Sequence, residues 1–177
     1  MKTEYEVRVL EIDKEEIIKK IEELGGTLEG IYDQRRYTYD TKPKSEGKWI
    51  RLRTTGDITT LAIKEVTSNK IDGTKELEIE VSEFEDTNKI MMHLGYDDPY
   101  YQENKRTRYT LNDVELDIDE WPLIPAYLEI EAKNEEKIEE TINLLGIDKL
   151  KVTTNKVKSI FKEIYQIDID EVRELKF

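Results

Sequence analysis

The clearest strand pattern in this 177-residue chain is the segment Thr3-Glu4-Tyr5-Glu6-Val7-Arg8-Val9-Leu10 (residues 3–10). Its residues alternate strictly between an apolar and a charged set, namely Tyr5, Val7 and Val9 against Glu4, Glu6 and Arg8. Such alternation is typical of a β-strand with one apolar and one polar face. We therefore predict a strand over 3–10.

An amphipathic helix is predicted directly after this strand. Asp13 stands at the N-cap position, and an apolar stripe of Ile17, Ile18, Ile21 and Leu24 ends at Gly25-Gly26. The same unit, a strand and then a helix that ends in Leu-Gly, recurs over 75–95 and 127–146. A repeated unit of this kind indicates one architecture along the whole chain.

Five further strands are predicted between these units, at 34–40, 48–54, 59–65, 104–111 and 114–120. Asn112-Asp113 joins the last two as a tight hairpin, which sets Arg106 opposite Asp119 and Arg108 opposite Asp117. A final helix is expected over 155–165, before a loosely held acidic tail over 166–177. We predict a single domain over 1–177, with its core at about 3–165.

The polar faces of these strands are almost purely ionic. The charged positions are Glu4, Glu6, Arg8, Arg51, Arg53, Lys64, Glu76, Glu78, Glu80, Arg106, Arg108, Glu115, Asp117, Asp119, Glu129 and Glu131. Amphipathic helices need an apolar sheet surface to pack against, so helices outside a closed sheet leave the charged faces pointing inward. The pattern thus predicts a barrel whose interior is a polar tunnel lined by both signs of charge.

Such an interior favours a ligand, because an unpaired buried ion costs several kcal/mol. Clustered carboxylates without Cys suit Mg²⁺ or Mn²⁺, while arginines and a lysine on separate strands suit phosphate oxygens. Together these groups are suited to chemistry on a phosphoric anhydride. The alternative for any one strand is a solvated face with cross-strand ion pairs.

Composition excludes several classes of protein. The chain carries 41 acidic and 28 basic residues, a net charge of −13, which argues against general binding to a nucleic-acid backbone. It has no cysteine, so disulfides and thiol catalysis are excluded. It also shows no long apolar run and no signal-peptide core, and we expect a cytoplasmic protein that does not bind membranes.

The ordered motifs resemble the CYTH superfamily of triphosphate tunnel metalloenzymes, which includes class IV adenylyl cyclases, thiamine triphosphatases and inorganic triphosphatases. Glu4-Tyr5-Glu6-Val7-Arg8 is similar to the family's E-x-E-x-K, with Arg8 in place of the lysine. The other matching segments are Gln34 to Asp40, Arg51-Leu52-Arg53, Lys64, Glu76 to Glu80, Lys105 to Arg108, Ile118-Asp119 and Leu128 to Glu131. Arg36 stands where the family usually has an acidic residue.

The resemblance implies an α+β fold, a closed eight-stranded antiparallel β-barrel with a charged interior and flanking amphipathic helices. It implies metal ligands at Glu4, Glu6, Glu78, Asp119, Glu129 and Glu131, and Mg²⁺ or Mn²⁺ as the cofactor. It implies a phosphate clamp of Arg8, Arg51, Arg53, Lys64, Arg106 and Arg108, with catalytic roles at Arg8, Lys64 and Asp119. A homodimer is an alternative to the monomer.

Three functions follow as hypotheses. The first is metal-dependent hydrolysis of a triphosphate-containing substrate, such as inorganic tripolyphosphate, thiamine triphosphate or a nucleoside triphosphate. The second is a class IV adenylyl cyclase that forms cyclic AMP and pyrophosphate from ATP. The third is a polyphosphate-binding or nucleotide-binding module without turnover.

Overall fold

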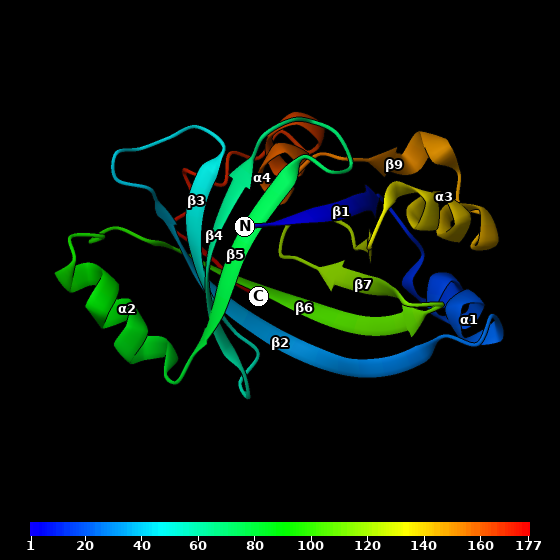
Figure 1. The fold of residues 1–177 in the computed structure, drawn as a ribbon, viewed down its shortest axis with the longest axis horizontal. Helices are drawn as coiled ribbons and strands as arrows, with labels where there is room; N and C mark the ends of the chain where they lie inside the picture. The colour runs from blue at the N-terminus through cyan, green and yellow to red at the C-terminus, as the bar shows by residue number, and fades with distance from the viewer.

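One large β-sheet that closes on itself forms the centre of the molecule (Figure 1), in a computed structural model that describes residues 1–177. Eight strands follow one another around the barrel in the order β6-β2-β3-β4-β5-β1-β8-β7, and β7 pairs again with β6. All these pairings are antiparallel. The strands are β1 (Lys2–Val9), β2 (Thr27–Asp40), β3 (Lys48–Thr54), β4 (Thr59–Val66), β5 (Thr74–Val81), β6 (Tyr100–Leu111), β7 (Val114–Glu120) and β8 (Tyr127–Ala132). The predicted eight-stranded antiparallel barrel is confirmed.

The β6–β7 hairpin has the register that the sequence predicts. Asn112 and Asp113 both have positive φ, at 51° and 63°, as a two-residue turn of this type requires. Arg106 lies opposite Asp119, and Arg108 lies opposite Asp117. Because side chains alternate along a strand, this register sends all four charges to the tunnel side.

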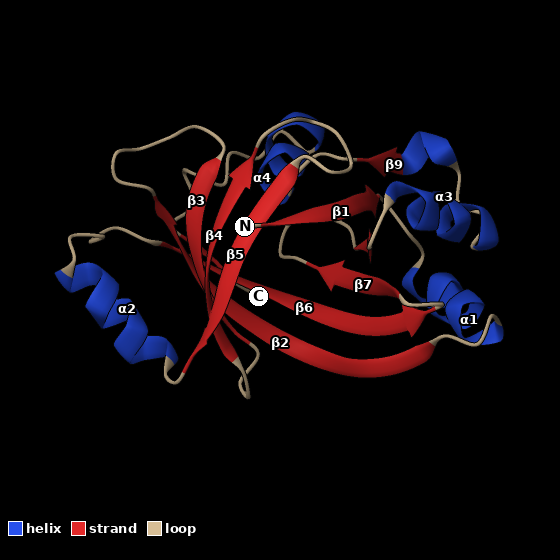
Figure 2. Cartoon of the chain, viewed as in Figure 1, coloured by secondary structure: helices blue, strands red, loops and turns tan.

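Helices cover the apolar outer face at two places (Figure 2). The helices α1 (Lys14–Glu23) and α3 (Glu135–Leu144) lie at one end of the barrel, where Ile21 and Ile138 are fully buried against β1, β7 and β8. Helix α2 (Phe84–His93) packs on the outside of β3. The Asp13 side chain accepts a hydrogen bond from the Glu16 N–H, as the N-cap prediction requires.

The covering is incomplete on β5. Leu77 and Ile79, on its apolar face, are 55% and 56% exposed. No helix packs there, so the prediction of helices outside the barrel holds for β1, β3, β7 and β8 but not for β5.

The C-terminal segment departs from the predicted tail. After a 3₁₀ turn η1 (Lys149–Lys151) and a short β9 (Val152–Thr153), the final helix begins as α4 (Val157–Ser159) and continues as a π-helical turn η2 (Ile160–Ile164). The segment beyond it is held rather than loose, because Ile169 and Leu175 are buried beside Trp121 and β10 (Glu174–Leu175) pairs parallel with β6. The acidic residues of this segment suggested a loosely held tail, although Ile169 and Leu175 anchor it. Each helix of the structure is too short or too polar to cross a membrane.

Candidate functional site

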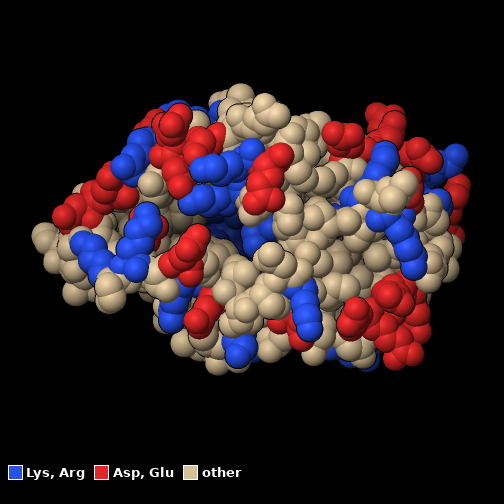
Figure 3. Space-filling model, turned by 90° about the horizontal axis from the view of Figure 1, so that it is seen from above, with Lys and Arg blue, Asp and Glu red and all other residues tan.

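The barrel encloses a cavity of about 1330 Å³. Every side chain predicted for the site lines it, namely Glu4, Glu6, Arg8, Arg51, Arg53, Lys64, Glu78, Arg106, Arg108, Asp119, Glu129 and Glu131. Seen from above, the molecule is hollowed at this place, and Lys and Arg side chains gather in the hollow (Figure 3). Alternation within each strand therefore brings together residues that are far apart in the sequence.

Strand order divides the tunnel into two arcs of opposite charge. Apart from Asp40 at the end of β2, the inward charges of the four neighbouring strands β6, β2, β3 and β4 are basic. We call this half the basic arc: Arg106, Arg108, Arg36, Arg51, Arg53 and Lys64. The other four strands, β5, β1, β8 and β7, form the acidic arc, in which Lys2 and Arg8 are the exceptions. The strand β2 thus stands across the barrel from β1, and β3 stands across from β8.

The two arcs neutralise each other where they meet. At the β6–β7 boundary, Arg106 donates from Nε and Nη2 to the two Asp119 carboxylate oxygens, at 2.8 and 2.6 Å. At the other boundary, Lys64 Nζ lies 2.9 Å from Glu4 Oε2, and Arg51 Nη2 donates to Glu76 Oε1 at 2.8 Å. Two of the predicted metal ligands form salt bridges with arginines here. Asp119 pairs with Arg106, and Glu78 pairs with Arg51 and Arg53.

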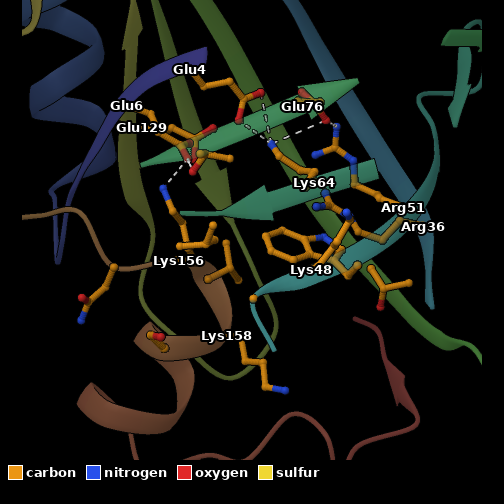
Figure 4. Close-up of a pocket in the computed structure, with 18 of the residues that line it drawn as sticks. Glu4, Glu6, Arg36, Lys48, Arg51, Lys64, Glu76, Glu129, Lys156 and Lys158 are labelled. Atoms are coloured by element: carbon orange, nitrogen blue, oxygen red, sulfur yellow. Dashed lines mark hydrogen bonds and ion pairs between the residues drawn. The ribbon is translucent and has the colours of Figure 1, made fainter. Parts of the chain in front are cut away.

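Toward the middle of the acidic arc, two cations balance part of the charge. Arg8 Nη2 donates to Glu6 Oε2 at 2.8 Å and also pairs with Glu129. Lys156 Nζ donates to Glu6 Oε1 at 2.7 Å (Figure 4). Burial acts to raise the pKa of the Glu6 carboxyl, but Arg8 and Lys156 outweigh it and hold that pKa below its ordinary value.

Other carboxylates in this arc are less fully balanced, although Lys64 pairs with Glu4 and Arg108 pairs with Glu115. Glu131 forms no ion pair, and burial, with the neighbouring Glu129 and Glu6 carboxylates, raises its pKa. Burial and a hydrogen bond shared with Glu76 raise the pKa of Glu4 to about 8. Burial and the Asp117 carboxylate raise the pKa of Glu115 to about 7. Burial is the largest cause of all three shifts and neighbouring carboxylates add to it, so a bound cation would stabilise the charged forms.

The basic arc has the opposite surplus at its centre. Burial, and then the neighbouring Arg53 and Arg51, lower the pKa of Arg36 to about 9. Arg51, together with burial, lowers the pKa of Arg53 to about 10. Guanidinium groups stay charged in proteins, so these directions record crowded positive charges that an anion would relieve.

The carboxylates are suited to a hard divalent cation. No group of three Asp, Glu or His side chains converges on one point, because arginines and lysines hold most of these oxygens. Glu131 is free of such a partner, its backbone lies opposite Glu6 on β1, and the repulsion among Glu131, Glu129 and Glu6 demands positive charge. An all-oxygen donor set of this kind fits Mg²⁺ or Mn²⁺.

Lys156 and Arg36 line the cavity but were absent from the predicted set. Lys156 enters from the C-terminal segment, and Arg36 enters from β2 between Arg53 and Gln102. Arg36 shares the inward parity of Gln34 and Thr38, so alternation along 34–40 could have found it. No signal in the sequence places Lys156 beside Glu6, because the contact spans 150 residues.

Comparison with known proteins identifies a family for this chain. The family model of the CYTH domain matches residues 2–165. No curated protein matches the sequence.

Several solved structures share the fold. The PH1012 protein of Pyrococcus horikoshii OT3 is 25% identical over 86% of this chain and 96% of its own, with a TM-score of 0.76. A candidate adenylate cyclase from Vibrio parahaemolyticus is 12% identical over 91% and 98%, also with a TM-score of 0.76. A candidate adenylyl cyclase from Hippeastrum, described with a dominant triphosphatase activity, is 16% identical over 92% and 96%, with a TM-score of 0.60.

Proposed function

The chain belongs to the CYTH domain family, and from this membership we propose that it is a metal-dependent phosphohydrolase of triphosphate-containing substrates. The candidates are inorganic tripolyphosphate, thiamine triphosphate and a nucleoside triphosphate. One observation carries the proposal: the tunnel is split into a basic and an acidic arc, each with unbalanced charge near its centre.

The charge distribution of a metal–triphosphate complex is complementary to that of the tunnel. Its phosphate oxygens would lie against the basic arc, and its cation would lie against the acidic arc. We expect both arcs to attract the complex. Their unbalanced charges are buried, and solvent screens buried charges poorly. The alternative for a single strand is a solvated charged face. It does not account for this tunnel, because Arg8, Arg36 and Asp119 are at most 8% exposed.

Arg8, Arg51, Arg53, Lys64, Arg106 and Arg108 form the substrate clamp in this proposal. Guanidinium forks hold phosphate oxygens in fixed directions, so they position the scissile anhydride bond within the tunnel. Arg8 and Lys64 stabilise the negative charge that develops on the leaving oxygen. Asp119 holds the Arg106 guanidinium in place through its two hydrogen bonds.

The metal ligands proposed are Glu4, Glu6, Glu129 and Glu131, with Asp119 and Glu78 at the boundaries of the arcs. When bound, Mg²⁺ or Mn²⁺ supplies a Lewis acid that polarises the phosphoryl oxygens. Glu6 and Glu129 are oriented for this role by Arg8, which contacts both.

Adenylyl cyclisation is the second candidate. Two solved structures of the same fold, from Vibrio parahaemolyticus and Hippeastrum, are described as adenylyl cyclase candidates. The dominant activity given for the Hippeastrum protein is that of a triphosphatase, which supports hydrolysis as the first choice.

The test is an assay of the purified chain with tripolyphosphate, thiamine triphosphate and ATP, each with Mg²⁺ and with Mn²⁺. Released phosphate supports hydrolysis, and cyclic AMP with pyrophosphate supports the cyclase. Binding of all three without any turnover would leave a binding module and overturn the enzyme. Glu4→Gln and Glu6→Gln should abolish most activity, whereas Glu29→Gln, an exposed change of equal charge on β2, should not. Equal activity in all three variants would remove the metal assignment.

A further inference from the structure

We propose that Arg36 binds the terminal phosphate group of the substrate, as an anion-binding residue added to the clamp at the centre of the basic arc. This inference rests on the proposed function. It concerns a residue at which this chain differs from the pattern that it resembles.

Arg36 is the tunnel arginine without an acidic partner. Arg36 is 8% exposed, and its guanidinium forms no salt bridge, although the Asp119 carboxylate acts on it from beyond that distance. Arg8, Arg51, Arg53, Arg106 and Arg108 each form at least one ion pair. A buried and unpaired charge is costly, so an arginine retained in this state is one that a ligand would complete.

Only some of the N–H donors of the Arg36 guanidinium have hydrogen-bond partners within the protein. Arg36 Nη2 donates to Gln34 Oε1 at 2.9 Å and to the side-chain oxygen of Asn104, both of them neutral amides. Arg36 Nε is buried and has no hydrogen-bond partner. Since a guanidinium carries five N–H donors, capacity remains for an incoming anion.

Neighbouring arginines increase the demand for negative charge. Arg36 lies directly across from Arg53 in the β2–β3 pair, on the tunnel face, and Figure 4 shows it beside Arg51. Like charges in this cross-strand position repel. The pKa of Arg36 is lowered to about 9, by burial first and then by Arg53 and Arg51.

Packing holds the side chain in its place. The Arg36 guanidinium lies over the Trp121 ring, 4.6 Å from its centroid, and Trp121 is itself 4% exposed. A side chain held between an indole and two amides is already ordered before a ligand arrives, so binding costs little additional entropy.

A terminal phosphate is the anion that suits this place. β2 stands across the barrel from β1, so Arg36 is far around the tunnel from the proposed metal ligands Glu4 and Glu6, whereas Asp119 is joined to it through Asn104. A chain of phosphates bound by a metal at the acidic arc would place its far end toward Arg36. Terminal phosphates carry close to two charges near neutral pH, more than an internal phosphate of the same chain.

The experiment measures equilibrium binding of inorganic tripolyphosphate by titration calorimetry in EDTA, without any turnover. Arg36→Gln should weaken binding by about tenfold or more, as expected for the loss of a charge-assisted hydrogen bond. Arg36→Lys should lie between this variant and the unmodified chain, because lysine keeps the charge without the planar fork. Arg35→Gln is the matched control, since Arg35 is the exposed neighbour on the same strand and should stay within about twofold.

Thermal unfolding without ligand separates binding from a structural role. Loss of an unpaired buried charge should leave the Tm of Arg36→Gln equal to or above that of the unmodified chain. Unchanged affinity in Arg36→Gln, or an equal loss in Arg35→Gln, would overturn the proposal and leave the proposed function standing. If Arg36→Gln does not fold, unchanged affinity in Arg36→Lys overturns it instead. If the unmodified chain does not bind tripolyphosphate in EDTA, the proposal fails, whereas the proposed function is decided separately by the turnover assays with Mg²⁺ and Mn²⁺.

Discussion

Lys156, in the C-terminal segment, and Glu6, on β1, form an ion pair in which Nζ and Oε1 are 2.7 Å apart. The side chains are 17% and 5% exposed, so the pair lies within the tunnel wall. Lys156 therefore ties the end of the chain to the acidic arc and shares Glu6 with Arg8.

Lys156→Gln should lower the free energy of unfolding by about 1–3 kcal/mol, because it removes a hydrogen bond between charged groups and leaves a buried carboxylate less balanced. Urea denaturation measures this loss. Lys149→Gln, the same change at an exposed lysine of η1, should stay close to the unmodified chain. Equal stability of the two variants would show that the Lys156–Glu6 pair contributes nothing.

Arg51→Gln and Arg53→Gln should each lower kcat/KM for the preferred triphosphate by about tenfold or more, since each removes a charged donor from the clamp. Steady-state phosphate release measures the effect. Arg35→Gln removes the same charge from the outside of the barrel and should keep its activity. If tripolyphosphate affinity is unchanged in both clamp variants, the arginines are merely solvated charges and the proposed binding mode is wrong.

Glu131→Gln should weaken Mn²⁺ binding by about tenfold or more, if this unpaired carboxylate is a metal ligand. Its metal-free Tm should be equal to or above that of the unmodified chain, because repulsion from Glu129 and Glu6 is removed. Calorimetric titration with Mn²⁺ and thermal unfolding in EDTA measure the two effects. Glu29→Gln is the control for charge alone, and a similar Mn²⁺ affinity in both variants would contradict the assignment.

Glu4 should make the metal-free protein lose stability as pH rises. Burial and the shared hydrogen bond with Glu76 raise its pKa from 4.5 to about 8, so the folded state retains a proton that the unfolded state has released. That contribution is lost between these two values as pH increases. The Tm advantage of Glu4→Gln over the unmodified chain should therefore grow from about pH 5 to about pH 8 and then level off. A constant difference over this range, measured in EDTA, would contradict the raised pKa.

The local sequence pattern was sufficient to predict the individual strands, helices and turns. Alternation located all eight barrel strands, and Asp13, Gly25 and the Asn112-Asp113 turn marked helix and hairpin boundaries. The hairpin even determined the Arg106–Asp119 contact, because turn length sets register and register sets which side chains face each other. The ionic strand faces, the need of the helices for an apolar sheet surface and the resemblance together predicted that these elements close into a barrel.

The C-terminal segment shows where local pattern was insufficient. Ile169 alternates with acids only over Ile167 to Asp170, and Leu175 stands alone between Glu174 and Lys176, so neither belongs to a pattern long enough to predict burial. They are buried because Trp121 and Phe161 offer an apolar surface at that end of the barrel. Such a surface exists only after distant segments have packed together.

Alternation along the strands identified the residues that point into the tunnel, since the parity of the residue number sets the side of a strand. Which of these charges neutralise one another depends on the folded barrel. Strand order around the barrel, not order along the chain, places four basic strands together, sets Arg36 beside Arg53, and brings Lys156 to Glu6. The reason is physical: the energy of an ion depends on the distance to every other charge and on its burial, and neither quantity exists before the barrel has closed.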